Sequence, residues 1–324
     1  MTSDGYTFLA RDLEDGEVAL PAPLEFELVW SFDSPAHSFE GVFPCARGYD
    51  DLYSLEVRRA GALIFSGQLD ETTIRQNDGG AQLRLLARSR GAVLLDNEAL
   101  PQTHLDVSLD DMFRDHVRPY GIEGMRTDVG QDAFLNEYQI LKGTSEWEAF
   151  YNFFRLTGLG IAYFDAEDRL VCMNQEPYGA VHRFSNRRAD ALHFSDLKLT
   201  DNRYSPISRF LIRDRDGVYS YGYTNSRAAA LRIQRKRYLI PSPSFSGSAT
   251  GGQIDASILV RRSMLGKRVV TLTAPGLLDI RRRDLVDLET DFGQYDGLFV
   301  YQVRHRRAAA GETTTLSLLD KNFI

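Results

Sequence analysis

Asp51-Leu52-Tyr53-Ser54-Leu55-Glu56 recurs near the other end of the chain as Asp284-Leu285-Val286-Asp287-Leu288-Glu289, with four of six positions identical. Two further pairs of stretches follow in the same order at a near-constant offset, namely Phe65-Ser66-Gly67-Gln68-Leu69 with Phe299-Val300-Tyr301-Gln302-Val303, and Leu83-Arg84-Leu85-Leu86 with Leu316-Ser317-Leu318-Leu319. Each copy spans 36 residues, 51–86 and 284–319. Any two three-stranded meanders share Leu-x-Leu patterns, but the ordered agreement predicts two copies of one β unit.

The segments around the first copy have the pattern of antiparallel strands. Residues 24–30 alternate apolar with acidic side chains, and Asn77-Asp78-Gly79-Gly80 is a turn signal between two apolar runs. Gln82-Leu83-Arg84-Leu85 alternates strictly, which buries one face of a strand and leaves the other face in water. We therefore expect an antiparallel β domain over residues 1–95.

The hydrophobic period changes to that of helices after about residue 96. Ser108 can cap a first helix, and Ser145 begins a capping box for a second helix that ends at Gly158. Residues 161–173 then have the pattern of a short hairpin. These elements predict an α+β unit over residues 96–200.

The last third of the chain returns to strands. A helix is expected up to about Met264, after an exposed loop at residues 241–248. Four strand candidates follow, at residues 268–273, 284–288, 298–303 and 313–319. The predicted fold class is α+β and mainly β, with two antiparallel β domains bracketing an α+β insert domain. The predicted boundaries are 1–95, 96–200 and 201–324, and the second β domain includes the connecting helix and loop.

Composition excludes several classes of protein. The 324 residues include 45 acidic and 38 basic side chains, so the net charge is −7, and a phosphate backbone is repelled on average. Two cysteines are too few for a disulfide framework or a zinc cluster, which favours folding in a reducing compartment. The N-terminus lacks a signal-peptide pattern, and no apolar run approaches the roughly twenty residues that cross a bilayer. We expect no membrane contact from this chain.

Residues with catalytic potential have simpler structural interpretations. Asp50-Asp51 and Asp110-Asp111 are adjacent carboxylates, but neighbours on a strand point to opposite faces, and the second pair fits the first turn of a helix. Gly158-Leu159-Gly160 runs from helix to strand, the reverse of a nucleotide-binding loop. Cys45 and Cys172 are expected to be unreactive thiols. The sequence therefore predicts no catalytic residue, no cofactor-binding residue, no metal ligand and no enzyme activity.

His182, His193 and the basic runs are expected on the surface. None of the six histidines forms a helical pair spaced as in a zinc protease, and His182 and His193 lie in a polar, arginine-rich stretch. The best nucleic-acid candidate is Arg232-Ile233-Gln234-Arg235-Lys236-Arg237-Tyr238, supported by Arg281-Arg282-Arg283 and by Arg304, Arg306 and Arg307. The acidic net charge favours ion pairs with a neighbouring subunit or a tube protein over DNA binding.

Several stretches resemble one protein family in family order. They are 57–70, 83–89 and 94–96 in the first part; the helix from Ser108 to Tyr120-Gly121-Ile122 and residues 143–150 with Thr157-Gly158-Leu159 in the middle; and Lys236-Arg237-Tyr238, 277–288 and 301–318 at the end. The chain is similar to the central hub protein of contractile phage tail baseplates, the late control protein D family. That family also occurs in phage-derived bacteriocins and, fused to a spike, in type VI secretion spike proteins.

The resemblance implies two tail-tube-like β domains around an α+β domain, assembled as a homotrimer. The implied pseudo-six-fold ring joins the hexameric tail tube to the trimeric spike, and DNA meets the chain only as transit through the channel, which the net charge predicts to be acidic. Tube protein, spike protein and other baseplate proteins are the implied partners. The implied location is the tail baseplate of a virion or injection particle, assembled in the bacterial cytoplasm. Because the sequence stops at Ile324 without a spike domain, the spike is expected to be a separate protein.

Alternative functions stay open at this stage. The chain could be a tail-associated peptidoglycan hydrolase, a nucleic-acid-binding module, or the hub of a non-contractile phage tail. Phage and bacteriocin particles are not distinguished by the sequence.

Overall fold

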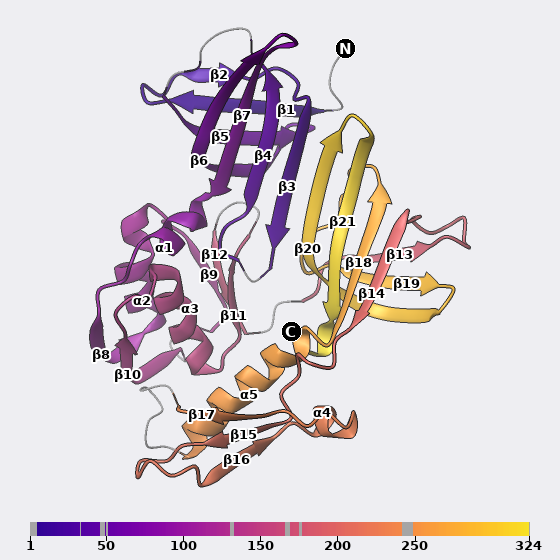
Figure 1. The fold of residues 1–324 in the computed structure, drawn as a ribbon. Helices are drawn as coiled ribbons and strands as arrows, with labels where there is room; N and C mark the ends of the chain where they lie inside the picture. Colours follow the sequence, from indigo (N-terminus) through magenta and orange to yellow (C-terminus); the bar gives the residue numbers. More distant parts are fainter. Residues whose placement is uncertain are drawn as a thin grey trace.

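The computed structural model describes residues 5–32, 34–45, 49, 51–129, 133–165, 169–174, 177–241 and 249–323 (Figure 1). Asp50, most of the turn predicted at 165–168 and nearly all of the loop predicted at 241–248 lie outside these residues. Strands dominate the fold, and the described α-helices lie within residues 93–265. The mainly β, α+β fold class is confirmed.

The N-terminal part is a two-layer β structure. Its strand order is β3-β4-β7-β6-β5-β1-β2, and its elements are β1 (Tyr6–Asp12), β2 (Glu17–Ala19), β3 (Glu25–Ser31), β4 (Ser38–Pro44), β5 (Leu52–Arg59), β6 (Ala62–Asn77) and β7 (Gly80–Ser89). The predicted turn joins β6 to β7. Alternate residues of β7, from Leu83 to Ser89, are buried, and the layers enclose an aromatic core that includes Phe8, Phe26, Phe39, Phe43 and Phe65.

The helical insert is built around two capped helices that confirm the predicted starts. Ser108 and Ser145 each form a capping box, because a serine hydroxyl accepts an orphan N–H while the third residue of the helix reaches back. Gly158 ends the second helix in the left-handed conformation, at φ 72°. The elements are η1 (Arg90–Ala92), α1 (Val93–Asp96), β8 (Gln102–Ser108), α2 (Leu109–His116), η2 (Arg118–Tyr120), β9 (Met125–Thr127), β10 (Phe134–Ile140), α3 (Glu146–Thr157), β11 (Ile161–Phe164) and β12 (Leu170–Met173).

The C-terminal part repeats the β architecture and adds a small outlying unit. The main strands are β13 (Val181–Ser185), β14 (Asp196–Asp201), β18 (Arg268–Pro275), β19 (Leu285–Thr290), β20 (Gly293–Ala308) and β21 (Gly311–Asp320), followed by η5 (Lys321–Phe323). The outlying unit contains β15 (Arg209–Ile212), β16 (Tyr221–Thr224), α4 (Ser226–Ala230), β17 (Lys236–Leu239) and α5 (Ala249–Leu265). Helix α5 lies against this three-stranded sheet (Figure 1) and confirms the helix predicted up to Met264.

Strands β13 and β14 belong to the C-terminal sheet by their pairing. Strand β13 pairs with β19 and β14 pairs with β18, although both lie largely within the range 96–200 predicted for the insert. We therefore propose a boundary near residue 180 between the insert and the second β domain. The boundary near residue 95 stays a prediction.

The two β units are true repeats, but their register differs from the sequence alignment. The hairpin turns start at Asn77 in the first unit and at Ala308 in the second. Each long strand also skips one residue at a bulge, Asp70 in β6 and Tyr301 in β20, and these two residues have the same separation along the chain as the two turn residues. The alignment made from sequence was therefore wrong by two or three residues, because Leu-x-Leu patterns match equally well after a shift of two.

One antiparallel ladder joins the two β units inside the chain. Residues 302–307 of β20 pair with residues 26–31 of β3, from Gln302 opposite Ser31 to Arg307 opposite Phe26. We call this ladder the internal joint, and Figure 1 shows β20 and β3 side by side. His305 faces Leu28 across it, and both side chains are buried.

Candidate functional site

The internal joint fuses strands of both units into one eight-strand layer. Its order is β14-β18-β21-β20-β3-β4-β7-β6, and each neighbouring pair is antiparallel. Four strands come from each unit. The layer therefore ends at two strand edges, one on β14 and one on the distal half of β6.

The first end is the distal half of β6. Strand β5 pairs only with the proximal half of β6, up to Gln68, so residues 71–76 have a partner strand on one side only among the described residues. Ile74 is 47% exposed there. Beside it lies an open hollow of about 410 Å³ lined by Tyr49, Asp51, Leu52, Thr72 and Ile74. Unpaired edges with apolar side chains are templates for another strand.

The second end is β14. Its six residues, Asp196–Asp201, pair with β18 on one side and with no other strand of the described chain. Leu199 is 36% exposed. Asp201 at the end of the strand is held by the ammonium of Lys267, and this contact lowers the pKa of its carboxyl group. The two edges expose an Ile and a Leu, although apolar side chains are rarely left on a free edge.

The outward face of the eight-strand layer is polar, with charges of both signs. Arg84 contacts Glu40 at 2.8 Å and Glu71 at 3.6 Å, so one guanidinium bridges three strands. Arg304 approaches Glu27 at 3.7 Å across the internal joint. These exposed pairs contribute little stability individually. They do show that charges of both signs lie on this face.

The basic run lies on the outlying unit, away from the other basic clusters. Arg203, Arg232, Arg235 and Arg237 line an open hollow of about 500 Å³ with Tyr204. The guanidinium of Arg235 lies 4.4 Å from the centre of the Tyr204 ring, and the ammonium of Lys236 lies 5.2 Å from that of Tyr238. Because these cations occupy ring faces, the faces are less available to stack nucleic-acid bases.

The supporting basic clusters have structural partners instead. Arg282 donates to the carbonyls of Ser31 and Phe164, at 3.0 and 2.6 Å, and so ties the insert to the sheet. Arg307 pairs with Glu312 on the neighbouring strand. The structure therefore does not bring the three predicted basic clusters together.

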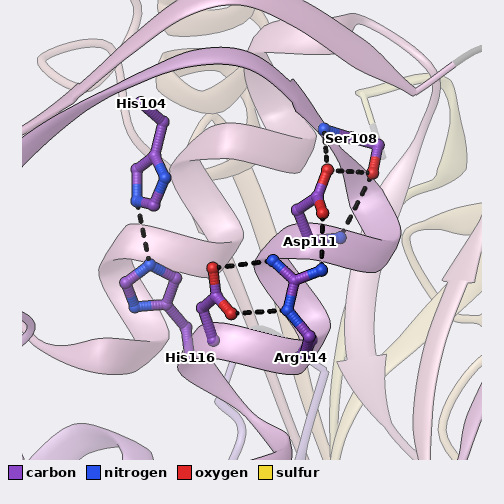
Figure 2. A network of polar contacts seen from close by, with 6 residues as sticks. His104, Ser108, Asp111, Arg114 and His116 are labelled. Atoms are coloured by element: carbon purple, nitrogen blue, oxygen red, sulfur yellow. Dashed lines mark hydrogen bonds and ion pairs between the residues drawn. The ribbon is translucent and has the colours of Figure 1, made fainter.

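A polar network links Ser108 at the end of β8 to Asp111 and Arg114 of α2 (Figure 2). The Asp111 carboxylate accepts from the Ser108 backbone at 3.0 Å and from its hydroxyl at 2.5 Å, and Arg114 donates to it at 2.7 Å. These contacts, led by the Ser108 hydroxyl, lower the pKa of Asp111 to about 2. The interpretation of Asp110 and Asp111 as first-turn helix charges is confirmed.

A buried His–Glu pair extends this network to α3. Glu146 accepts from His116 Nδ1 at 2.6 Å and from the Tyr120 hydroxyl at 2.9 Å, and His116 Nε2 lies 3.4 Å from His104 Nε2. Glu146 and His116 are 7% and 3% exposed. Burial, followed by the contact with Glu146, raises the pKa of Tyr120 to about 12, and burial lowers the pKa of His104. Both carboxylate oxygens of Glu146 accept hydrogen bonds, so this buried pair connects α3 to α2 and η2.

The remaining candidate residues have structural positions. Cys172 is buried in β12, where burial raises the pKa of its thiol, and Cys45 is half-buried. His193 is exposed as predicted, but His182 is half-buried and contacts Asp284 at 2.8 Å, so its solvated assignment was wrong. Among the described residues, no group of three His, Cys, Asp or Glu side chains could hold a metal ion. No helix in the described ranges is long and apolar enough to cross a membrane.

Sequence reasoning missed the two edges and the His116–Glu146 pair. The pair is separated by 30 residues, and neither residue type is unusual at a helix end. The free edges arise only from pairing between strands far apart in the chain. No local pattern marks them, apart from the exposed Ile74 and Leu199.

Known proteins match this chain in structure and not in sequence. No family model matches the chain, and no curated protein matches its sequence. A tail protein from Neisseria meningitidis has a similar structure, with a TM-score of 0.78 at 17% identity, and the match covers 98% of each chain. The 43 kDa tail protein of prophage MuSo2 from Shewanella oneidensis gives 0.76 at 14% identity, covering 99% of this chain and 98% of that one.

A secretion-system protein shares the fold as well. It is an E. coli component of the type VI secretion system, described as similar to the T4 bacteriophage tail proteins gp27 and gp5. Its TM-score is 0.58 at 10% identity, and the match covers 96% of this chain and 76% of that chain. The chain therefore has the hub-like fold shared by phage tail proteins and a type VI secretion component, as its sequence resemblance implies.

Proposed function

We propose that this chain is the structural hub of a phage tail or of a phage-tail-like injection machine. Three copies form a pseudo-six-fold ring that joins a hexameric tail tube to a trimeric spike. The observation that carries this proposal is the internal joint, because it shows two copies of one β unit already docked edge to edge within one chain.

The geometry of the layer suits a closed ring. Homo-oligomers close when the same interface repeats around a rotation axis. Each chain supplies two similar units, so three chains supply six. A ring of six similar units can contact a hexameric tube, while its true three-fold symmetry matches a trimeric spike. Because the layer has an even number of antiparallel strands, its two end strands run in opposite directions. A rotated copy therefore presents an antiparallel partner to each end.

The outward face of the layer is the proposed channel wall. The inward face packs on the apolar cores, with buried residues such as Leu85 and Leu316. The opposite face carries paired charges such as Arg84 with Glu40. A wall of this kind carries charges of both signs, and the acidic channel expected from net charge stays a prediction. Cations paired as Arg84 is are less available to bind transiting DNA.

Partners and location follow from the same proposal. Tube protein, spike protein and other baseplate proteins contact the ring, and the particle assembles in the cytoplasm of the bacterial host. Solved tail proteins with the same fold over nearly the whole chain support a structural role. No residue of this chain is assigned a catalytic role.

Light scattering and negative-stain imaging of the purified chain test the proposal. We expect a trimer and ring-shaped particles. A monomer or dimer at every concentration, with no rings when tube protein is added, would overturn it. Clearing of peptidoglycan by the isolated chain would favour the hydrolase alternative, and a sheath gene beside this one would assign the particle to a contractile machine.

A further inference from the structure

We propose that residues 71–76 of β6 pair with β14 of a second copy of this chain, with Ile74 directly opposite Leu199. We call this contact the external joint. The inference rests on the proposed ring and deepens it, because it names the segment that each copy uses and the register between them. The partner is a second copy of the chain, and the internal joint together with the repeat determines the pairing.

Strand β6 of the first unit corresponds to strand β20 of the second. Strands β6 and β20 share the same bulge, at Asp70 and Tyr301, and the turn follows at the same distance after it in both. Residues 71–76 are therefore the counterparts of residues 302–307, the segment of β20 that forms the internal joint. In β20 this segment has strands on both sides, whereas in β6 its outer side has none within the described chain.

Strand β14 of the second unit is the counterpart of β3 in the first. Strand β3 pairs with β4, and β14 pairs with β18. Val42 of β4 and Thr273 of β18 correspond, because their separation along the chain equals that of the two bulge residues. Val42 faces Glu25, and Thr273 faces Asp196. Strand β14 therefore occupies in the second unit the place of β3 in the first, with Glu25 corresponding to Asp196.

The register of the internal joint, applied to the counterpart strands, gives the register between β6 and β14. His305 faces Leu28 in the internal joint, and their counterparts are Ile74 and Leu199. The neighbouring pair, Arg304 with Val29, transfers to Thr73 with Thr200. The external joint thus follows from the internal one with no adjustable shift. A slip by one residue would place Ile74 opposite Lys198 or Thr200, whose side chains lie on the other face of the layer.

The exposed side chains at the two edges fit this pairing. His305 and Leu28 are 6% and 0% exposed, whereas Ile74 and Leu199 are 47% and 36% exposed. The hollow of about 410 Å³ beside Ile74 is where the core would continue if a strand lay next to β6. Leu199 of a second copy enters this space, and burying both side chains removes apolar surface from water.

One pair in the proposed register is unfavourable. Arg75 falls opposite Lys198, and like charges directly opposite each other destabilise a sheet. Asp196, diagonal to Arg75 in this register, offsets part of the repulsion. A slip by two residues would instead place Arg75 directly opposite Asp196, so charge alone does not choose the proposed register.

Cysteine cross-linking tests the joint directly. Two double variants, I74C with L199C and T73C with T200C, are made in a Cys45→Ser background, and Cys172 stays buried. Adjacent pairs alternate between close and wide spacing, so one of the two pairs lies at the close spacing. We expect one pair to give covalent trimers on denaturing gels under mild oxidation. The shifted control, I74C with D201C, should give at least tenfold less.

Each outcome of the experiment decides a different claim. Trimers linked through either matched pair, with the shifted pair unlinked, support the joint. A native trimer in which neither matched pair links, or in which only the shifted pair links, overturns the joint and leaves the proposed hub standing. A chain that stays monomeric with its intact fold confirmed by circular dichroism overturns both.

Discussion

The imidazole of His305 and the indole of Trp30 meet edge to face, with ring centroids 5.2 Å apart, inside the internal joint. Neither nitrogen of His305 has a hydrogen-bond partner among the described residues. Burial, reinforced by the nearby Arg59, lowers the pKa of His305 to about 4. The ring is therefore neutral at physiological pH, and the joint contains a group that acid would charge.

The stability of the fold should fall with acidity between about pH 6.5 and pH 4. In this range the unfolded chain binds a proton at His305, whose unfolded pKa is near 6.5, while the folded chain does not. The loss is on the order of 3 kcal/mol for this group. His305→Phe keeps the aromatic contact with Trp30 and should make the pH dependence of the urea midpoint shallower; His37 and His104, whose pKa values burial also lowers, should retain part of it. His193→Phe at an exposed position should leave it unchanged, and an equal slope in both variants would contradict the assignment.

Replacing Ile74 with Asp should abolish ring formation without unfolding the chain. The carboxylate would be buried against Leu199 of the next copy, and an unpaired buried charge is strongly unfavourable. We expect a monomer by sedimentation, with a melting temperature within about 3 °C of the parent, as for a mild surface change. Leu105→Asp is the matched control, because Leu105 is 73% exposed on the insert, away from both edges. Loss of assembly in both variants would argue against a specific joint.

Replacing Lys198 with Glu should tighten the assembly. In the proposed register the new carboxylate lies opposite Arg75, so an attractive pair replaces a repulsive one. The repulsion removed and the attraction gained each contribute about 0.2–1 kcal/mol. The trimer should dissociate at a lower concentration, by about two- to tenfold per joint. The double variant R75E/K198E restores a like-charge pair and should lose the gain. Tightening by both variants would point to a different register.

Truncating Glu146 to Ala should destabilise the insert by about 2–4 kcal/mol, because His116 and Tyr120 would lose their common acceptor in a buried site. Urea unfolding followed by the fluorescence of Trp147, the other tryptophan being Trp30 in the sheet, reports the change. Glu123→Ala provides the control, since its carboxylate is 73% exposed and its contact with Arg118 spans 3.4 Å. Equal losses in the two variants would contradict the role given to the buried pair.

Local features of the fold were predictable from sequence, and long-range ones were not. The capping boxes at Ser108 and Ser145 depend on residues three positions apart, so their patterns were sufficient. The repeat was recognisable as well, but its register was not, because a shift of two keeps every side chain on its face. The hairpin turns at Asn77 and Ala308 and the shared bulges at Asp70 and Tyr301 fix the offset.

The candidate site depends on contacts that sequence order hides. Ser31 and Gln302 meet in the internal joint although 271 positions separate them. The correspondence between Glu25 of β3 and Asp196 of β14 is hidden in the same way, because the two strands are far apart in the sequence. His182 was misassigned for a related reason, since its partner Asp284 lies 102 positions away.

The covalent link between the two β units has a consequence for how such a ring could come apart. A ring of six independent units can open at any of six contacts. When units are linked in pairs, three contacts are continuous with the chain's own fold and open only if the protein unfolds. The other three depend on exposed residues such as Ile74 and Leu199 and can separate reversibly. Sequence changes at the separable contacts can therefore tune when the ring opens, without altering the stability of a single chain.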